Sequence, residues 1–270
     1  MKKQFKLGLI GSNLIAQTII KGAVLSDFLS QKKIIVSGVR SGDISALEEL
    51  GVQFVDDDRY VLENSEFQLL AVSAEELKSV ASNAKAVKQL KIITVADGLK
   101  KSEIKSAFGA SSTKIARAGA NLPCTIGSGS VGIDMSEYNS FFDDIEFISN
   151  LFDCIGTVLS VDESKFDAIT GISINGPAYV FMFIDGLIDA GVKQGLKRSE
   201  AKLLAVQALL GSAEMVERED YSLSELLMKA CNNGGSALSG VKSLEKNRFR
   251  EVIDEAVDES IKSLTERDAQ

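Results

Sequence analysis

A turn near the N-terminus is the first stretch of this chain whose residue types and spacing indicate a chemical function. Residues 5–10 are mainly apolar, a glycine follows at position 11, and apolar residues then recur at helical spacing. Gly11, Asn13 and Ala16 follow the G-x-G-x-x-G/A spacing of dinucleotide-binding turns, with asparagine in place of the middle glycine. The first N–H groups of a helix have no intrahelical partner, so they suit a pyrophosphate. The predicted cofactor contacts here are Gly8, Gly11, Ser12, Asn13 and Leu14.

The asparagine is the one departure from the glycine pattern in this turn. Asparagine tolerates positive φ better than most residues other than glycine. We therefore expect the turn to form with Asn13 at positive φ. Its backbone would approach a pyrophosphate less closely than a glycine would.

The end of the second predicted strand, residues 32–40, indicates which cofactor the chain prefers. Enzymes that bind NAD carry an acidic residue about 20 positions after the glycines, which accepts hydrogen bonds from the ribose. This chain has Ser37, Arg40 and Ser41 in that region and no acidic residue before Asp43. An arginine with hydroxyl groups suits a 2′-phosphate, so NADPH is favoured and NADH is the alternative. An ordinary surface arginine is the other interpretation of Arg40.

The composition excludes several classes of protein. The chain has 270 residues, 45% of them hydrophobic, which is enough for a sizeable core. Its net charge of −8 disfavours nucleic acid and membrane as partners, and we expect no membrane span and no signal peptide. The absence of histidine excludes Ser-His-Asp and Cys-His catalysis, and we predict no metal site. Three widely spaced cysteines, Cys124, Cys154 and Cys231, indicate buried thiols in a cytoplasmic protein.

The elements that must position the glycine turn alternate between strands and helices over the first 160 residues. Strands are predicted at 5–10, 32–40, 52–55, 67–72, 91–96, 114–117 and 156–161, with helices at 43–50, 75–90 and 141–154. This alternation predicts an α/β Rossmann domain with a mostly parallel sheet at residues 1–160. Only helices are predicted after that, at 162–172, 177–195, 198–218, 222–231, 237–245 and 249–267, so residues 161–270 form an all-α domain.

Two further stretches of the first domain are predicted to take no part in the chemistry. Gly127, Gly129 and Gly132 match G-x-G-x-x-G, but no clean strand precedes them and no long apolar helix follows. Residues 56–58, three consecutive aspartates, are expected to form a solvated turn at a helix start.

Two features of the helical part suggest an interface and a ligand site. The helix at 177–190 is apolar on nearly every face, which favours a subunit interface over the core of a monomer. Residues 232–240 place glycines before hydroxyl residues at a helix start, a pattern that can hold an anion on backbone N–H groups. An ordinary loop between helices is the other interpretation of this second stretch.

Taken together, these segments resemble pyrroline-5-carboxylate reductases over nearly the whole chain. Residues 161–196 are similar to that family's V-D-E … G-S-G-P-A-Y-V-F … D-A-G-V-x-x-G-L. Residues 232–240 resemble its S-P-G-G-T-T-x-A-G loop. Asn121 and Pro123 stand where the family has P-N-T-P, and Ala71-Val72 begin its A-V-K-P.

The resemblance implies hydride transfer from NAD(P)H to the C=N bond of Δ1-pyrroline-5-carboxylate, a cyclic imine acid, which yields L-proline. It also implies a homodimer formed through the helical domain, and often a ring of dimers. By position, the substrate carboxylate would lie on Gly234, Gly235, Ser236 and Ala237, with the Ser236 hydroxyl as the catalytic group. Val72, Ser73 and Asn121 would contact the cofactor.

The chain departs from the family pattern at several of these positions. Ser73-Ala74 replace Lys-Pro, Asp97 replaces a small residue, Gly119-Ala120 replace Met-Pro, Ile174-Asn175 replace Gly-Ser, and Asn232-Asn233 replace Ser-Pro. Two alternatives therefore stay open. One is a reductase of another imine or of a small carbonyl acid, and the other is a non-catalytic homologue that binds a dinucleotide.

Overall fold

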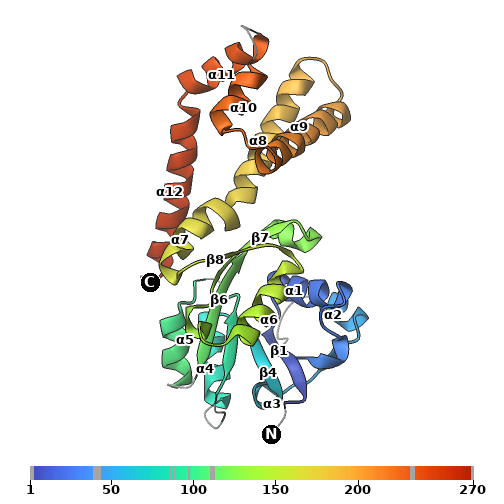
Figure 1. Cartoon of the computed structure of the whole chain (residues 1–270), viewed down its shortest axis with the longest axis vertical. Helices are drawn as coiled ribbons and strands as arrows, with labels where there is room; N and C mark the ends of the chain where they lie inside the picture. Colours follow the sequence, from blue (N-terminus) through green and yellow to red (C-terminus); the bar gives the residue numbers. More distant parts are fainter. Residues whose placement is uncertain are drawn as a thin grey trace. The chain divides into compact units, whose positions relative to one another are not determined.

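A single mixed sheet forms the N-terminal part of the molecule (Figure 1). A computed structural model of the chain describes residues 3–38, 44–84, 87, 89–96, 98–109, 113–231 and 235–268. Within these residues, eight strands follow the order β3-β2-β1-β4-β5-β6-β7-β8, and β6 with β7 is the antiparallel pair. The strands are β1 Phe5–Gly11, β2 Ile34–Ser37, β3 Gln53–Phe54, β4 Ser65–Ala71, β5 Lys91–Thr94, β6 Lys114–Ala120, β7 Gly129–Asp134 and β8 Gly156–Ser160. The predicted α/β class with a mostly parallel sheet is confirmed.

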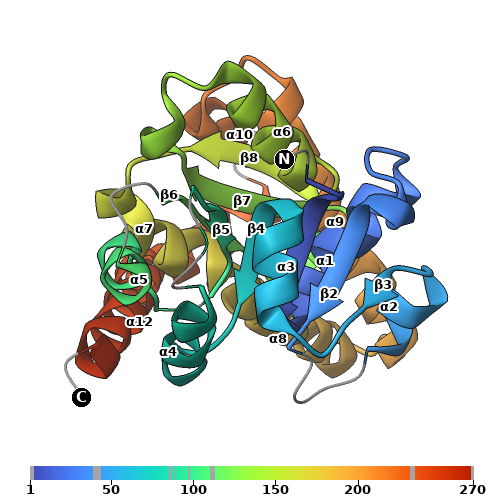
Figure 2. The same ribbon diagram turned by 90° about the horizontal axis from the view of Figure 1, so that it is seen from below.

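Helices cover both faces of this sheet (Figure 2). They are α1 Leu14–Leu25, α2 Ser45–Glu49, α3 Asp58–Asn64, α4 Ala74–Asn83, α5 Lys101–Phe108 and α6 Phe142–Asp153. Successive residues of a strand point to opposite faces, so Leu69 joins the cluster under α1 and α6 while Leu70 joins the one under α3, α4 and α5. Buried on both faces, the central strands read as continuous apolar runs.

β7 and α5 are elements that the sequence reasoning did not predict. Two glycines of β7 allow close approach by other elements. A side chain at Gly129 would overlap Cys124, and a Cβ at Gly132 would lie 2.8 Å from Ile169. Gly129 and Gly132 therefore serve packing, and the absence of a function in this segment stays a prediction. Cys124 is buried here, whereas Cys154 and Cys231 are half-buried.

The chain after the sheet is helical. A 3-10 turn η4 (Glu163–Lys165), helix α7 (Phe166–Ile169) and a π turn η5 (Thr170–Ile174) lead into α8 Gly176–Lys193. The remaining helices are α9 Arg198–Arg218, α10 Leu223–Ala230, α11 Ser236–Lys246 and α12 Phe249–Asp268. Contacts divide the chain into two compact units, Met1–Asn175 with Leu264–Gln270, and Gly176–Ser263. The predicted boundary after residue 160 stays a sequence-based prediction, since α7 and η5 are helical yet belong to the unit of the sheet.

The second unit buries little apolar surface of its own. Its cluster of buried side chains consists of Ile188, Ala201 and Ala205, with Ile184 packed against them. By contrast, Met182 is 80% and Leu203 71% exposed. The continuous helical run Glu163–Lys193 is 31 residues long and apolar enough to meet the length and hydropathy criteria for a membrane span, with 11% of its most apolar stretch buried. This differs from the expectation that no segment would meet them, and the exposed apolar surface requires a partner.

Candidate functional site

The turn between β1 and α1 has the geometry of a close backbone approach. Gly11 adopts a φ of +89°, and a side chain there would overlap the carbonyl oxygen of Ala71 at the end of β4. Only glycine fits this position without strain. Gly8 lies in the middle of β1 instead, where a side chain would overlap Ser65. The structure gives Gly8 a packing role, which differs from the cofactor contact that we expected.

Asn13 caps helix α1 with its own side chain. Its backbone is extended, with φ −84° and ψ 166°, so the expectation of positive φ is wrong. The Oδ1 atom accepts a hydrogen bond of 2.8 Å from the N–H of Ala16, and Nδ2 donates to the carbonyl of Val95 at 3.4 Å. The asparagine therefore occupies one of the N–H groups that a pyrophosphate would otherwise use. Ser12 and Leu14 flank it, and Leu14 is exposed.

A buried carboxylate lies beside the carboxyl ends of β1 and β2. Ser37 donates a hydrogen bond of 2.9 Å to Oδ1 of Asp58, which is 6% exposed. A Cβ at Gly38 would lie 3.2 Å from this oxygen and 3.1 Å from the nitrogen of Gly11. Asp58 was expected to be solvated, and that prediction is wrong. Its neighbour Asp57 caps α3 instead, so position 58 turns inward.

This carboxylate changes the argument about cofactor preference. In NAD-binding proteins the acidic residue that binds the ribose is expected after β2, and this chain has no acidic residue there before Asp43. Asp58 reaches the same edge of the sheet from α3, a position that spacing alone does not reveal. Arg40, the predicted partner of a 2′-phosphate, lies outside the described residues.

The residues after β4 also cap a helix. Val72 is buried beside Gly11, and Ser73 forms a capping box with Glu76 at the start of α4. The Ser73 N–H donates to Oε2 of Glu76 at 2.9 Å, and its Oγ accepts from the Glu76 N–H at 3.3 Å. Ser73 thus lies at the edge expected for a cofactor residue, with its backbone and side chain engaged within α4.

The amide of Asn121 is engaged within the protein. It follows β6, is 9% exposed, donates to Oγ of Ser130 at 2.9 Å and accepts from the Ser130 N–H at 3.0 Å. Oγ of Ser130 in turn lies 2.6 Å from Oγ of Ser173 in the π turn. Asn121 therefore joins β7 and η5, in addition to any contact with a nicotinamide.

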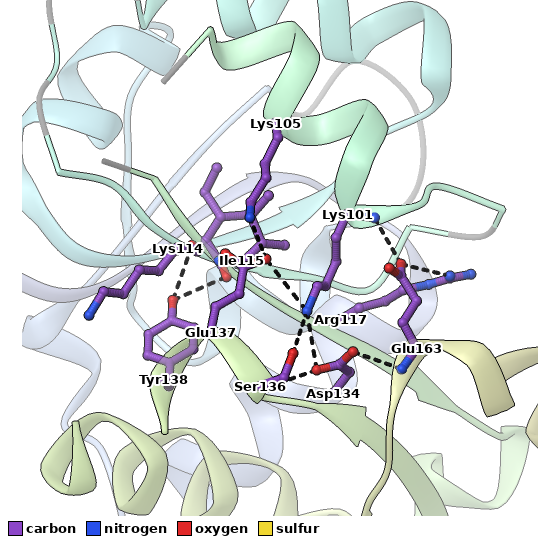
Figure 3. A network of polar contacts seen from close by, with 11 residues as sticks. Lys101, Lys105, Lys114, Ile115, Arg117, Asp134, Ser136, Glu137, Tyr138 and Glu163 are labelled. Atoms are coloured by element: carbon purple, nitrogen blue, oxygen red, sulfur yellow. Dashed lines mark hydrogen bonds and ion pairs between the residues drawn. The ribbon is translucent and has the colours of Figure 1, made fainter. Parts of the chain in front are cut away.

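A network of charges fixes the point where the helical run leaves the sheet (Figure 3). The N–H of Glu163 donates to Oδ2 of Asp134 at 2.7 Å, and its carboxylate accepts from the Lys101 N–H at 2.8 Å and from Arg117 at 3.0 Å. Lys101 Nζ lies 3.1 Å from Oδ1 of Asp134. Burial alone would raise the pKa of Asp134, but hydrogen bonds from Ser136 and the ammonium of Lys101 hold it below its ordinary value.

A small cavity opens beside this network, at the carboxyl ends of β5 and β6. Its volume is about 170 Å³, below the range typical of drug-sized ligands, so it suits a compact molecule. Ligands of open α/β sheets bind at this edge. Its walls include Ala96, Lys100, Arg117, Gly119, Phe166, Asp167, Thr170, Ile174 and Asn175. Sequence reasoning missed Arg117, although the alternation of β6 places it on the same face as Gly119.

The predicted substrate loop lies at the start of α11. Gly235 is the N-cap residue, with φ −65° and ψ 169°, and it makes no side-chain capping bond. Ser236 and Ala237 are the first two helical residues, and both are exposed. Their N–H groups belong to the helix turn that has no intrahelical acceptor. Gly234 lies outside the described residues.

Comparison with known proteins accounts for both parts of the chain. Residues 163–267 match the family model described as pyrroline-5-carboxylate reductase dimerisation, and residues 6–98 match the one described as NADP oxidoreductase, coenzyme F420-dependent. The chain is 31% identical to pyrroline-5-carboxylate reductase of Arabidopsis thaliana, over 94% of this chain and 92% of that protein. It is 32% identical to the enzyme of Synechocystis sp., over 93% of this chain and 94% of that protein.

Solved structures agree over the whole length. Pyrroline carboxylate reductase of Plasmodium falciparum with NADP bound gives a TM-score of 0.84 at 27% identity, covering 98% of both chains. Pyrroline-5-carboxylate reductase of Coxiella burnetii gives a TM-score of 0.87 at 26% identity, also over 98% of both chains. The exposed apolar surface of the helical unit is that of a dimerisation domain, so subunit packing accounts for it, which is consistent with a soluble protein.

Proposed function

Because this chain belongs to the pyrroline-5-carboxylate reductase family, we propose that it reduces Δ1-pyrroline-5-carboxylate to L-proline with NADPH as the hydride donor. The observation that carries this function is the near-complete match to reductases of that name, over 94% of this chain and 92% of one relative. The chain is an NADP-dependent oxidoreductase and forms a homodimer through its helical domain.

The turn after β1 fits the cofactor. Gly11 lets the turn pack directly against Ala71, where any side chain would overlap, and the N-terminus of α1 supplies N–H groups for a pyrophosphate. We assign Ser12, Asn13 and Leu14 to the same contact, with Val72, Ser73 and Asn121 along the neighbouring strand ends. Arg40 would hold the 2′-phosphate, while Ser37 and the Asp58 carboxylate to which it donates would lie beside the ribose.

The start of α11 fits the carboxylate of the substrate. Backbone N–H groups of Gly235, Ser236 and Ala237 would donate to it, and the positive end of the helix dipole favours negative charge. NADPH supplies the hydride when bound. The substrate carbon of the C=N bond accepts that hydride, and its nitrogen keeps or gains a proton from solvent. The Ser236 hydroxyl would lie near that nitrogen and hold the solvent molecule that supplies the proton. No histidine is required for this step.

Oxidation of NADPH in the presence of Δ1-pyrroline-5-carboxylate tests this function directly. The purified chain should consume NADPH and form L-proline in equal amounts. No turnover above background, with NADPH bound, would refute it. A panel of other cyclic imines and small carbonyl acids, run in parallel, addresses the alternative substrates, which the changes at Asn175, Asn232 and Asn233 favour. Calorimetric titration with NADPH addresses the non-catalytic alternative.

Arg40→Ala tests the cofactor preference. It should weaken NADPH more than NADH, by about 1–3 kcal/mol for the loss of a charged hydrogen bond. Dissociation constants of both cofactors, measured by calorimetry, give the answer. Arg218→Ala is the control, since Arg218 pairs with Glu214 on the exposed end of α9. An equal loss for both cofactors would make Arg40 an ordinary surface residue.

We extend the assembly to a ring of dimers and place the protein in the cytoplasm. Apolar side chains that are exposed on α9 and α10 of the single chain, such as Leu203 and Met228, offer surface for contacts between subunits. Light scattering after size-exclusion chromatography distinguishes a dimer from a larger ring.

A further inference from the structure

Three polar side chains form a continuous set of hydrogen bonds beyond the end of β6. Nδ2 of Asn121 donates to Oγ of Ser130 at 2.9 Å, and this Oγ lies 2.6 Å from Oγ of Ser173. Asn121 follows β6, Ser130 belongs to β7, and Ser173 lies in the π turn η5. All three residues belong to the compact unit that contains the sheet, so the network is complete within one unit.

The orientation of the Asn121 amide follows from the chemistry of its partners. Its Oδ1 accepts from the N–H of Ser130 at 3.0 Å, and a backbone N–H can only donate, so the amide oxygen must face it. The thiol of Cys124 donates to the same oxygen at 3.6 Å. Nδ2 carries two hydrogens, and Ser130 accepts one of them. The contacts formed within the described residues thus leave one N–H of the amide for a further acceptor.

The hydroxyl of Ser130 connects this amide to the π turn. Because Nδ2 can only donate, Oγ of Ser130 is the acceptor in that bond. Ser173 is the second partner of the hydroxyl and limits its rotation. The π turn packs closely on the sheet, since a Cβ at Gly119 would lie 2.7 Å from Cδ1 of Ile174. The packed turn therefore holds Ser173, which holds the hydroxyl that accepts from Asn121.

Asn121 lies at the edge of the sheet to which the cofactor is assigned. The 3-10 turn η2 (Leu122–Ile126) begins directly after it and packs against α1. Asn13 at the start of α1 donates to the carbonyl of Val95, which follows β5, the parallel neighbour of β6. The start of α1 and Asn121 therefore share one edge. Asn121 is 9% exposed, so the protein covers most of its surface.

We propose that Ser130 and Ser173 are positioning residues, which hold the Asn121 amide so that its remaining N–H donates to the carboxamide oxygen of the nicotinamide. The proposal rests on the proposed function, which assigns Asn121 to the cofactor. An amide that could turn would lose rotational freedom when the cofactor binds, and holding it in advance removes that cost. The two serines act through Asn121 and need no contact with the cofactor.

Binding of two related ligands tests the assignment. NADPH carries the nicotinamide, whereas 2′-phospho-ADP-ribose has the same phosphates and adenosine without it. Ser130→Ala should weaken NADPH about five- to tenfold, because the amide loses one of the bonds that orient it. The same variant should leave the affinity for 2′-phospho-ADP-ribose within about twofold of the wild type, whereas a general loss of structure would weaken both ligands. Calorimetry gives the dissociation constants.

The remaining variants separate a linked network from independent contacts. Ser173→Ala should weaken NADPH about twofold to threefold, and combining it with Ser130→Ala should add nothing, because Ser173 acts through the Ser130 hydroxyl. Thr125→Ala is the control, since Oγ1 of Thr125 donates to the carbonyl of Leu122 on the exposed side of η2. It should change neither ligand. Ser130→Thr keeps the hydroxyl and should restore NADPH binding.

A cofactor analogue identifies the atom that Asn121 contacts. The reduced 3-acetylpyridine analogue of NADPH keeps the carbonyl oxygen and lacks the amide nitrogen of the nicotinamide. Ser130→Ala should weaken this analogue by the same factor as NADPH. An analogue whose affinity does not change in Ser130→Ala would place Asn121 against the amide nitrogen and overturn the assignment.

These measurements use no imine, so they are independent of the turnover that tests the proposed function. A protein that shows this binding pattern but does not reduce Δ1-pyrroline-5-carboxylate supports the positioning role alone. Equal weakening of both ligands in Ser130→Ala, additive effects in the double variant, or a wild type that binds both ligands with equal affinity overturns the proposal. Ser173→Ala and Ser130→Thr keep the test available if Ser130→Ala does not fold.

Discussion

The N-termini of α1 and α11 make the most informative comparison in this molecule. Both helices follow a glycine-bearing turn, and both were expected from sequence to hold an anion. At α1 the side chain of Asn13 accepts the Ala16 N–H, so the chain satisfies part of its own terminus. At α11 the N-cap is Gly235, which has no side chain with which to cap the helix. The N-cap side chain therefore satisfies part of the terminus of α1, whereas the N-cap residue of α11 cannot do so.

Helix α5 shows what such a terminus does with a carboxylate. The N–H of Lys101, its first residue, donates to Oε1 of Glu163 at 2.8 Å, and Arg117 supplies a second partner. The chain thus contains its own example of a carboxylate held at a helix start. This example supports a carboxylate at α11, where the substrate would take the place that Glu163 has at α5.

Gly235→Asp would make α11 resemble α1, and we expect the largest effect from it. An aspartate at the N-cap accepts the N–H groups that the substrate would use, and its charge repels the substrate carboxylate. KM for Δ1-pyrroline-5-carboxylate should rise about 100-fold, since a hydrogen bond to a charged group contributes about 1.5–3 kcal/mol. Steady-state kinetics measure this, and circular dichroism checks that helix content is retained.

The neutral variant Gly235→Asn separates capping from charge. It should raise KM about tenfold, because it competes for the N–H groups without repulsion. An unchanged KM in the aspartate variant would show that α11 does not hold the substrate.

Asp134→Asn tests the start of η4, where a carboxylate of the chain itself accepts the first N–H group. Asp134 accepts the Glu163 N–H that begins η4, and its pKa is held low. A carboxyl whose pKa is lowered on folding stabilises the protein above its unfolded-state pKa, and this contribution is lost as pH falls through the folded-state value. The variant should lose roughly 1–3 kcal/mol at neutral pH, and the difference should shrink on acidification. Urea unfolding at a fixed protein concentration measures it. A pH-independent difference would contradict this account.

Ser236→Ala asks whether the first residue of α11 does more than its counterpart on α1. Leu14, at the same position of α1, has no hydroxyl. Loss of the Ser236 hydroxyl should lower kcat about tenfold, as expected for one hydrogen bond of about 1.4 kcal/mol. The dissociation constant of NADPH should not change. Unchanged turnover would remove Ser236 from the mechanism and leave only its backbone in the site.

Asn13→Gly would make α1 resemble α11, with the smallest expected effect. It frees the Ala16 N–H for the cofactor, so NADPH should bind about threefold more tightly. The helix should lose only a few tenths of a kcal/mol. Ser222→Gly is the control, since Ser222 caps α10 in the same way. Weaker NADPH binding in Asn13→Gly would mean that the amide itself contacts the cofactor.

The sequence predicted the elements of this fold where periodicity was strong. The predicted helix at 198–218 coincides with α9, and the predicted strand at 67–72 overlaps β4. β7 was missed because glycines that admit Cys124 and Ile169 replace the apolar alternation of a strand. The hydrophobic pattern of a segment therefore predicts its own secondary structure well. It does not predict where segments that are distant in sequence pack closely against each other.

Only those site residues whose role depends on backbone conformation could be predicted from the sequence. Gly11 could be identified because its conformation demands glycine. The inward turn of Asp58 and the seat of Ile174 over Gly119 depend on segments that meet only in the folded chain. Asn13 shows a further limit, since an asparagine at a helix start can either adopt positive φ or cap the helix, and the sequence is the same in both cases.

The sparse core of the helical unit makes the stability of this unit depend on a second copy of the chain. With Ile188, Ala201 and Ala205 as its buried cluster, much of the free energy that orders this unit must come from a second copy. Dilution then acts as a denaturant, and the melting temperature should rise with protein concentration. In the cell, a newly made chain would stay a monomer with an incompletely ordered helical unit until it associates with a second copy.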